Sequence, residues 1–351
     1  MKKKRSEMLT TFVRGEGIFE DYLPRSGIPD DFQNMAVMMA VLAVLTGMSV
    51  YSYGVRALIL ALVCLLTCWA ADSVCLILRR RSLHIHDLSP MITGLTIAVM
   101  MPASVPYHIA VAACVFAICI AKHPLGCHGS EIINCAAAGY IFAELSFPQW
   151  VLMYPKPFAE LPVDNIPAVA LYKSLSSTAI TSGLQNYSGI ELLIGNFTGP
   201  MGCTFTVLTA VCALFLMSRR AISAPAFFGE IGAAAAGSLL LGGMSSMRMV
   251  LVGGMTLFAA ILTADRAFAP KNAVGQLLYG VFAGLMLLAV MRISSLENPA
   301  VYVCIIAAPF GRVMDSLTLK GSRRKRVKRI FGNDITETID MIGGGENGEE
   351  K

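Results

Sequence analysis

The sequence predicts an all-α polytopic membrane protein, and three observations support this fold class. Of the 351 residues, 55% are hydrophobic and only 15% are charged, and the mean hydropathy is +0.64. Soluble proteins carry about a quarter charged residues. The apolar runs are long and continuous instead of alternating with a period of two, so helices and not barrel strands are expected to cross the bilayer. This composition excludes a soluble globular enzyme with a single core.

About ten membrane-spanning helices fit the length of the chain, because each needs about 20 apolar residues to cross a hydrocarbon core roughly 30 Å thick. The predicted segments are 35–53, 55–78, 89–102, 106–121, 131–147, 201–218, 225–243, 247–264, 273–292 and 298–315. The third and fifth are short and contain Pro90, Asn134 and Gly139. They are therefore predicted as half-helices or re-entrant segments as well as simple spans.

A long connection divides the predicted spans into two groups of five. The resulting organisation is an N-terminal segment at 1–34, a first five-helix repeat at 35–147, an outer loop at 148–200, a second repeat at 201–318 and a tail at 319–351. Since five is odd, two related halves would be inverted in the membrane, with a site near the midplane where broken helices meet. No apolar stretch precedes Asn34, so no cleavable signal peptide is expected.

The basic residues predict the orientation. With a cytoplasmic N-terminus, 22 of the 28 Lys and Arg residues fall on the inner side and five on the outer side. This asymmetry follows the positive-inside rule, so both termini are expected in the cytoplasm. The net charge of +5 then reflects topology, and no nucleic-acid partner is expected. The basic run at 322–329 fits a stop-transfer anchor, and its alternative is a patch for RNA or anionic lipid.

The cysteines and the histidines each allow a structural and a functional interpretation. The ten cysteines include no C-x-x-C pair and fall mostly inside apolar spans, which favours small buried hydrophobes over metal ligands. His84 and His86 belong to an interfacial loop or to a proton relay. Gly126 and Gly129 allow the backbone beside His123 to approach a ligand closely.

Carboxylates within or beside the spans are the strongest candidates for function, because an ionisable group in a bilayer is costly to keep. Asp265 follows the small-residue stretch that contains Gly253 and Gly254 and ends at the inner side. Asp72 and Asp315 are expected to pair with nearby arginines. The candidates are Asp72, Glu131, Glu144, Glu230, Asp265 and Asp315.

Three stretches resemble one known family in their order and spacing. They are Asp87-Leu-Ser-Pro-Met through Lys122-His-Pro-Leu-Gly to Asn134, Leu193-Ile-Gly-Asn-Phe-Thr-Gly-Pro-Met-Gly202, and Gly253-Gly254 through Asp265 to Gly280. Over roughly residues 35 to 318 the chain is similar to the RnfD component of the Rnf electron-transport complex, which is itself related to a membrane component of the sodium-pumping NADH:quinone reductase.

The resemblance implies a redox role in a bacterial inner-membrane complex. Members of the family pass electrons between ferredoxin and NAD, coupled to movement of Na+ or H+, together with other membrane and peripheral subunits. The RnfD component carries an FMN joined by its phosphate to a threonine in an outer-loop motif S-G-A-T-P-L. The corresponding stretch here is Leu175-Ser-Ser-Thr-Ala-Ile180, which nominates Thr178, flanked by Ser176 and Ser177, for covalent FMN.

A second, non-covalent flavin or an ion path is implied nearer the membrane centre. The residues nominated for it are Gly126, Gly129, Asn134, Gly253, Gly254 and Asp265. Two other functions stay open from the residues alone. One is a solute or ion channel built on the same inverted repeats, and the other is a flavin-free structural component of the complex. No metal site and no residue that performs substrate chemistry is predicted.

Overall fold

The computed structural model describes most of the apolar part of the chain. The described residues are 28–80, 88–125, 133–155, 157–158, 195, 197–252, 254–294, 296, 298–311 and 313–314, with backbone alone at 28–31, 125, 241–252 and 254. Within these ranges the chain is helical and contains no strand, only one isolated bridge between Ile222 and Asp265. The several apolar helices agree with the predicted all-α membrane class.

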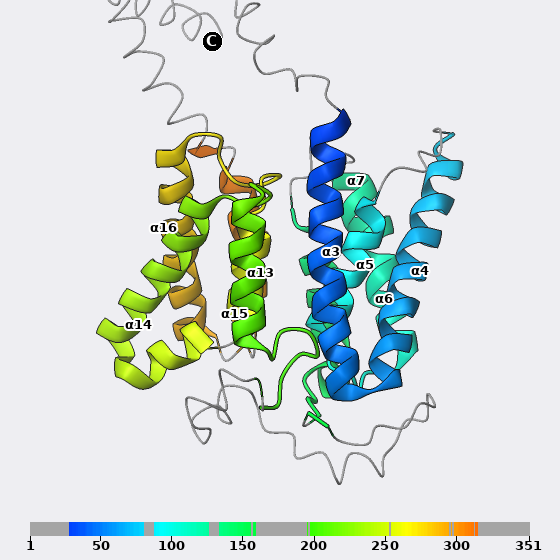
Figure 1. Cartoon of the computed structure of the whole chain (residues 1–351), viewed down its shortest axis with the longest axis horizontal. Helices are drawn as coiled ribbons and strands as arrows, with labels where there is room; N and C mark the ends of the chain where they lie inside the picture. Colours follow the sequence, from blue (N-terminus) through cyan, green and yellow to red (C-terminus); the bar gives the residue numbers. More distant parts are fainter. Residues whose placement is uncertain are drawn as a thin grey trace, which may run out of the picture.

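The helices lie in two groups beside each other (Figure 1). The first group, drawn in blue to cyan, is formed by α3 (Ile28–Tyr53), α4 (Val55–Leu78), α5 (Ser89–Met100), α6 (Tyr107–Val115), the π-helix η1 (Phe116–Lys122), α7 (His123–Leu125), α8 (Cys135–Ser146) and α9 (Pro148–Val151). The second group, drawn in green to orange, is formed by α13 (Thr206–Ser218), α14 (Ala224–Val252), α15 (Gly254–Thr263), α16 (Ala273–Ile293) and an apolar helix at Pro299–Gly311 that we call the C-terminal helix.

In the part of the chain that the structure describes, three helices are long and apolar enough to cross a membrane by themselves, at Phe32–Tyr53, Val55–Leu78 and Ala273–Ile293. By contrast, α5 has 12 residues and α15 has 10, which at about 1.5 Å per residue is well short of a bilayer core. The third and fifth predicted segments are indeed short, since α8 also has 12 residues. The number of ten spans and the inverted repeats stay predictions.

Two boundaries differ from the predicted ones for simple physical reasons. We expected a connection between 243 and 247, but α14 continues without interruption to Val252. Residues 244–252 contain neither Pro nor Gly, so nothing in them ends a helix. Near the N-terminus, α3 begins at Ile28 instead of residue 35. The residues before Met35 form the first turns of this helix, although several of them are polar.

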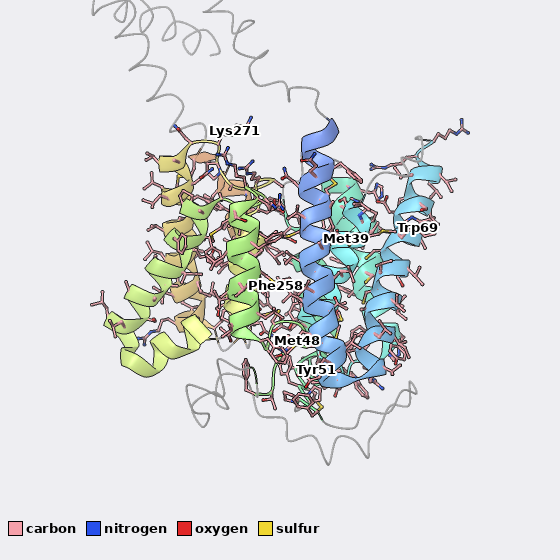
Figure 2. All side chains as sticks on the ribbon, in the orientation of Figure 1. Met39, Met48, Tyr51, Trp69, Phe258 and Lys271 are labelled. Atoms are coloured by element: carbon pink, nitrogen blue, oxygen red, sulfur yellow. The ribbon has the colours of Figure 1, made fainter. Side chains whose placement is uncertain are left out.

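The long helices present one face to the core and another to the outside. On α4, Leu60, Cys64 and Cys68 are completely buried, whereas Leu66 and Trp69 are more than half exposed. Lipid tails are as apolar as leucine, so exposed apolar side chains are stable against a bilayer. Trp69 points outward from α4 in Figure 2.

Helix ends that carry basic residues gather at one end of the molecule. In Figure 1, α4 and α13 end at the top and α16 begins there. Arg79 and Arg219 directly follow α4 and α13, and Lys271 precedes α16 and is labelled at the top of Figure 2. The chain enters α13 from the opposite end, where α3 turns into α4 (Figure 1). These three basic residues therefore lie at one end of the molecule, and the orientation in the membrane stays a prediction.

Candidate functional site

The residues nominated for covalent flavin, Thr178 with Ser176 and Ser177, lie outside the described residues. Gly254 is the first residue of α15 and is described by its backbone alone. The described membrane part of the chain would support the flavin segment. Other residues singled out in the sequence also lie outside the described ranges, namely Gly126, Gly129, Gly253, Glu131, Asp315, His84 and His86.

A break in the helix after α5 is held by a buried arginine. Met101 is extended (φ −82°, ψ 155°), and the chain re-enters a helix only at Tyr107. Arg56 at the start of α4 donates from Nε to the carbonyl of Ala103 at 2.8 Å and from Nη2 to that of Ser104 at 3.0 Å. Backbone groups freed by a broken membrane helix need such partners, because no water replaces the lost bonds. Sequence reasoning had only counted Arg56 as an outer basic residue.

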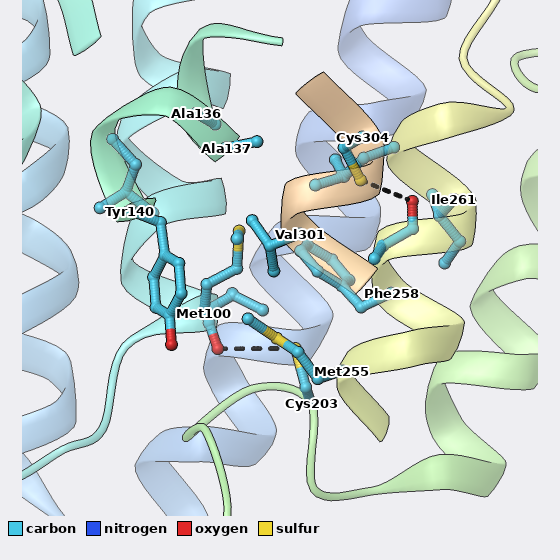
Figure 3. Close-up of a cluster of buried hydrophobic side chains, with 14 of the residues drawn as sticks. Met100, Ala136, Ala137, Tyr140, Cys203, Met255, Phe258, Ile261, Val301 and Cys304 are labelled. Atoms are coloured by element: carbon cyan, nitrogen blue, oxygen red, sulfur yellow. Dashed lines mark hydrogen bonds between the residues drawn. The ribbon is translucent and has the colours of Figure 1, made fainter. Parts of the chain in front are cut away.

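The segment that follows the outer loop is hydrogen-bonded to the chain at this break. The N–H of Met201 donates to the carbonyl of Met101 and that of Gly202 to the carbonyl of Val99, both at 3.0 Å. A Cβ atom on Gly202 would lie 2.5 Å from Val99 Cγ1, so only glycine fits here. Figure 3 shows Cys203 next to this contact, between Met100 and the α15 residue Met255. The end of the loop thus reaches the core between the two groups.

A second break follows α15. The N–H and the Oγ of Ser223 both donate to the carbonyl of Ala264 at 2.8 Å. Asp265 bridges to Ile222, and its carboxylate accepts the N–H of Ala267 at 3.2 Å. Burial raises the pKa of Asp265, against the opposing effect of the neighbouring backbone N–H groups. Asp265 therefore organises the turn after α15, near the end where basic residues gather.

A buried polar network joins the two groups. Asn298, which precedes the C-terminal helix, donates its side-chain amide to the hydroxyl of Tyr140 at 2.8 Å and to that of Tyr154 at 2.9 Å. The two hydroxyls lie 3.4 Å apart. Figure 3 shows the Tyr140 ring descending from α8 beside Met100. The candidate carboxylate Glu144 is also buried on α8, one turn after Tyr140. Sequence reasoning missed this network.

One signal in the sequence could have found Asn298. Asn298-Pro-Ala before the C-terminal helix repeats the pattern of Asn134-Cys-Ala before α8. Asn134 has a different role. Its Oδ1 accepts the N–H of Ala137 at 3.1 Å and so caps the start of α8. Asn134 and Asp265 share no hydrogen bond in the described part of the chain. Their place in one flavin or ion site stays a prediction.

A buried ion cluster lies between α4 and the end of η1. Asp72 Oδ1 is 3.3 Å from Lys122 Nζ and 3.1 Å from His123 Nε2, and all three side chains are buried. The expected pairing of Asp72 with arginines is therefore corrected, because the π-helix η1 brings Lys122 onto α4. Burial lowers the pKa of His123, and the charge of Asp72 opposes that effect.

Two thiols lie one turn away from this cluster. Cys75 Sγ of α4 is 3.5 Å from Cys119 Sγ of η1. All the cysteines whose side chains are described are free thiols. Among the described residues, no group of three or more His, Cys, Asp or Glu side chains could hold a metal ion.

Comparison with known proteins gives a consistent result. The sequence model of the NQR2, RnfD, RnfE family matches residues 30–322. The chain is 28% identical over 250 residues to the D component of the Na(+)-translocating ferredoxin:NAD(+) oxidoreductase complex of Acetobacterium woodii, covering 70% of this chain and 76% of the relative. It is 27% identical over 314 residues to the D component of an ion-translocating oxidoreductase complex of Shewanella amazonensis, covering 79% and 90%.

A further relative is named for a different ion. The D component of the proton-translocating ferredoxin:NAD(+) oxidoreductase complex of Clostridium ljungdahlii is 23% identical over 248 residues, covering 68% of this chain and 75% of the relative. The names of these relatives thus include both Na+ and H+ as the translocated ion.

Proposed function

Because the chain belongs to the NQR2, RnfD, RnfE family, we propose that it is the RnfD-type membrane component of an ion-translocating ferredoxin:NAD oxidoreductase. The observation that carries this proposal is the family match over residues 30–322, which covers both groups of helices. The names of the relatives from Acetobacterium woodii and Shewanella amazonensis support the same role. The other components of such a complex would be its partners in the bilayer.

The proposal includes an FMN bound through its phosphate to Thr178 in the outer loop. When bound, the flavin supplies the redox chemistry, and the protein fixes its position. The described residues support this role indirectly. The segment that follows the loop is held by the backbone hydrogen bonds of Met201 and Gly202 at the break after α5. These bonds fix the end of the loop to the core.

The proposal also includes two inverted five-helix repeats with broken or short helices. The short helices α5 and α15 support it, since each is followed by non-helical chain whose carbonyls are bonded by a side chain from a neighbouring element. The gathering of basic residues at one end supports cytoplasmic termini in a bacterial inner membrane. A second, non-covalent flavin or the path of Na+ or H+ would lie between the breaks.

The flavin attachment can be tested on a denaturing gel. The purified, denatured protein should fluoresce under ultraviolet light, and Thr178→Ala should abolish the fluorescence. Thr181→Ala is the matched control, because Thr181 is the next hydroxyl along the chain and its loss should leave the band bright. A dark wild-type band would favour a flavin-free structural component instead. Solute uptake by the isolated chain in liposomes would favour a channel.

A further inference from the structure

A buried carboxylate in the second group has no role in the fold described above. Glu230 lies in the second turn of α14 and is 3% exposed. Its backbone is pressed against α16, because a Cβ atom on Gly284 would lie 2.5 Å from the Glu230 carbonyl oxygen. Small residues on a membrane helix allow such close approach. Glu230 is therefore fixed at a tight helix crossing inside the predicted membrane region.

The described neighbours of the Glu230 carboxyl are hydroxyls and a thiol. Thr263 Oγ1 of α15 forms a hydrogen bond with Glu230 Oε2. From α16, the hydroxyl of Tyr279 is within electrostatic reach, and from the C-terminal helix so is the thiol of Cys304. No ion pair joins Glu230 to a basic side chain in the described ranges. The carboxyl thus has no described cation to balance a negative charge.

The first group provides a contrast within the same protein. There the buried carboxylate of Asp72 has Lys122 at 3.3 Å and His123 at 3.1 Å. An ionised carboxylate without such a partner is strongly disfavoured in a low-dielectric interior, and buried groups avoid this cost by binding a proton. Asp72 thus has basic partners, whereas the described surroundings of Glu230 contain none and favour the neutral carboxyl.

The hydrogen bonds around Thr263 indicate where such a proton would lie. The Thr263 hydroxyl has one hydrogen and is also 3.2 Å from the carbonyls of Ala259 and Ala260. If it donates to either carbonyl, its bond to Glu230 needs a proton from the carboxyl. The Tyr279 hydroxyl, on a residue 1% exposed, has no hydrogen-bond partner among the described residues.

We propose that Glu230 is a reversible proton-binding site in the second group of helices, with Thr263 as its hydrogen-bonding partner. The Glu230 carboxylate binds one proton to become a carboxylic acid. The acid releases the same proton when it returns to the carboxylate. Asp265 follows α15 near the end with the basic residues and lies within electrostatic reach of Tyr279. The role in ion movement rests on the proposed function of the complex, but the binding of the proton does not.

Infrared spectroscopy of the purified complex tests the assignment directly. The wild type should show the C=O stretch of a protonated carboxyl that disappears as the pH rises from about 5 to 9, a range that covers buried glutamates. Glu230→Gln should remove this band. Thr263→Val should shift its frequency, because the hydrogen bond is lost. Asp72→Asn is the matched control and should leave the band unchanged, since Asp72 lies in the other group of helices beside the basic side chains of Lys122 and His123.

Two results would overturn the proposal. One is a spectrum that is the same for the wild type and Glu230→Gln at every pH. The other is a band that NaCl removes at constant pH, which would assign Na+ and not the proton to this carboxyl. Failure of the proposed electron-transfer role is seen separately, as a dark wild-type band on the denaturing gel, and does not alter the infrared result.

Discussion

Asn298 donates its side-chain amide to the hydroxyl of Tyr140 at 2.8 Å, across 158 positions of sequence and across the boundary between the two groups of helices. Both residues are buried, at 2% and 0% exposure. The same amide holds Tyr154 on the segment that leads into the outer loop. One side chain thus ties together both groups and the loop proposed to carry the flavin.

Replacing Asn298 should separate these elements. We expect Asn298→Leu to lower the stability of the purified protein by roughly 1–3 kcal/mol, because buried hydroxyls lose their partner. Thermal unfolding in detergent measures the change. Asn134→Ala is the control, with an expected cost of about 1 kcal/mol for a lost helix cap. An Asn298→Leu variant as stable as the wild type would show that the network does not hold the groups together.

The ion cluster should respond to the removal of one partner and recover when both are removed. Asp72→Asn leaves the Lys122 ammonium buried without a counter-charge, which typically costs about 3–5 kcal/mol. The double variant Asp72→Asn with Lys122→Met removes that charge and should regain most of the stability. Thermal unfolding of the wild type, both single variants and the double variant gives the coupling energy. Additive losses in the double variant would mean that the two charges do not interact.

The sulfur atoms of Cys75 and Cys119 are close enough to be joined by a mild oxidant. With a copper–phenanthroline catalyst and oxygen, which accepts the two electrons, we expect a disulfide between α4 and η1, since the Sγ atoms are already 3.5 Å apart. Mass spectrometry of the unreduced digest detects the linked peptides. Cys75→Ser should abolish the product, and Cys304→Ser should not. Absence of this linkage in the wild type would contradict the packing of η1 on α4.

The crossing of α14 and α16 should depend on Gly280. A Cβ atom there would lie 2.1 Å from the carbonyl oxygen of Ala226, so Gly280→Ala should force the helices apart and destabilise the protein by about 1–3 kcal/mol. Gly47→Ala on α3 is the matched control, because nothing lies within 4 Å of its Cβ position. There we expect a neutral effect or a gain of about 0.5–1 kcal/mol. Melting temperatures in detergent compare the two variants, and equal behaviour would argue against the close crossing.

The sequence was sufficient to predict the properties that depend on local composition. It indicated an all-α membrane protein and placed most helices within a few residues, because apolar runs and helix-breaking residues act locally. It also predicted the short helices α5 and α8. It predicted a connection at 244–246, whereas α14 continues to Val252.

The tertiary structure decided which polar side chains meet. Asp72 pairs with Lys122 because η1 packs on α4, although three arginines are nearer to it in sequence. Asn298 reaches Tyr140, and Thr263 reaches Glu230, only because helices distant in sequence cross there. Hydropathy indicates which segments enter the bilayer, but it does not indicate which helices pack against each other. The partners of a buried charge, and hence its protonation and its use, follow from that packing.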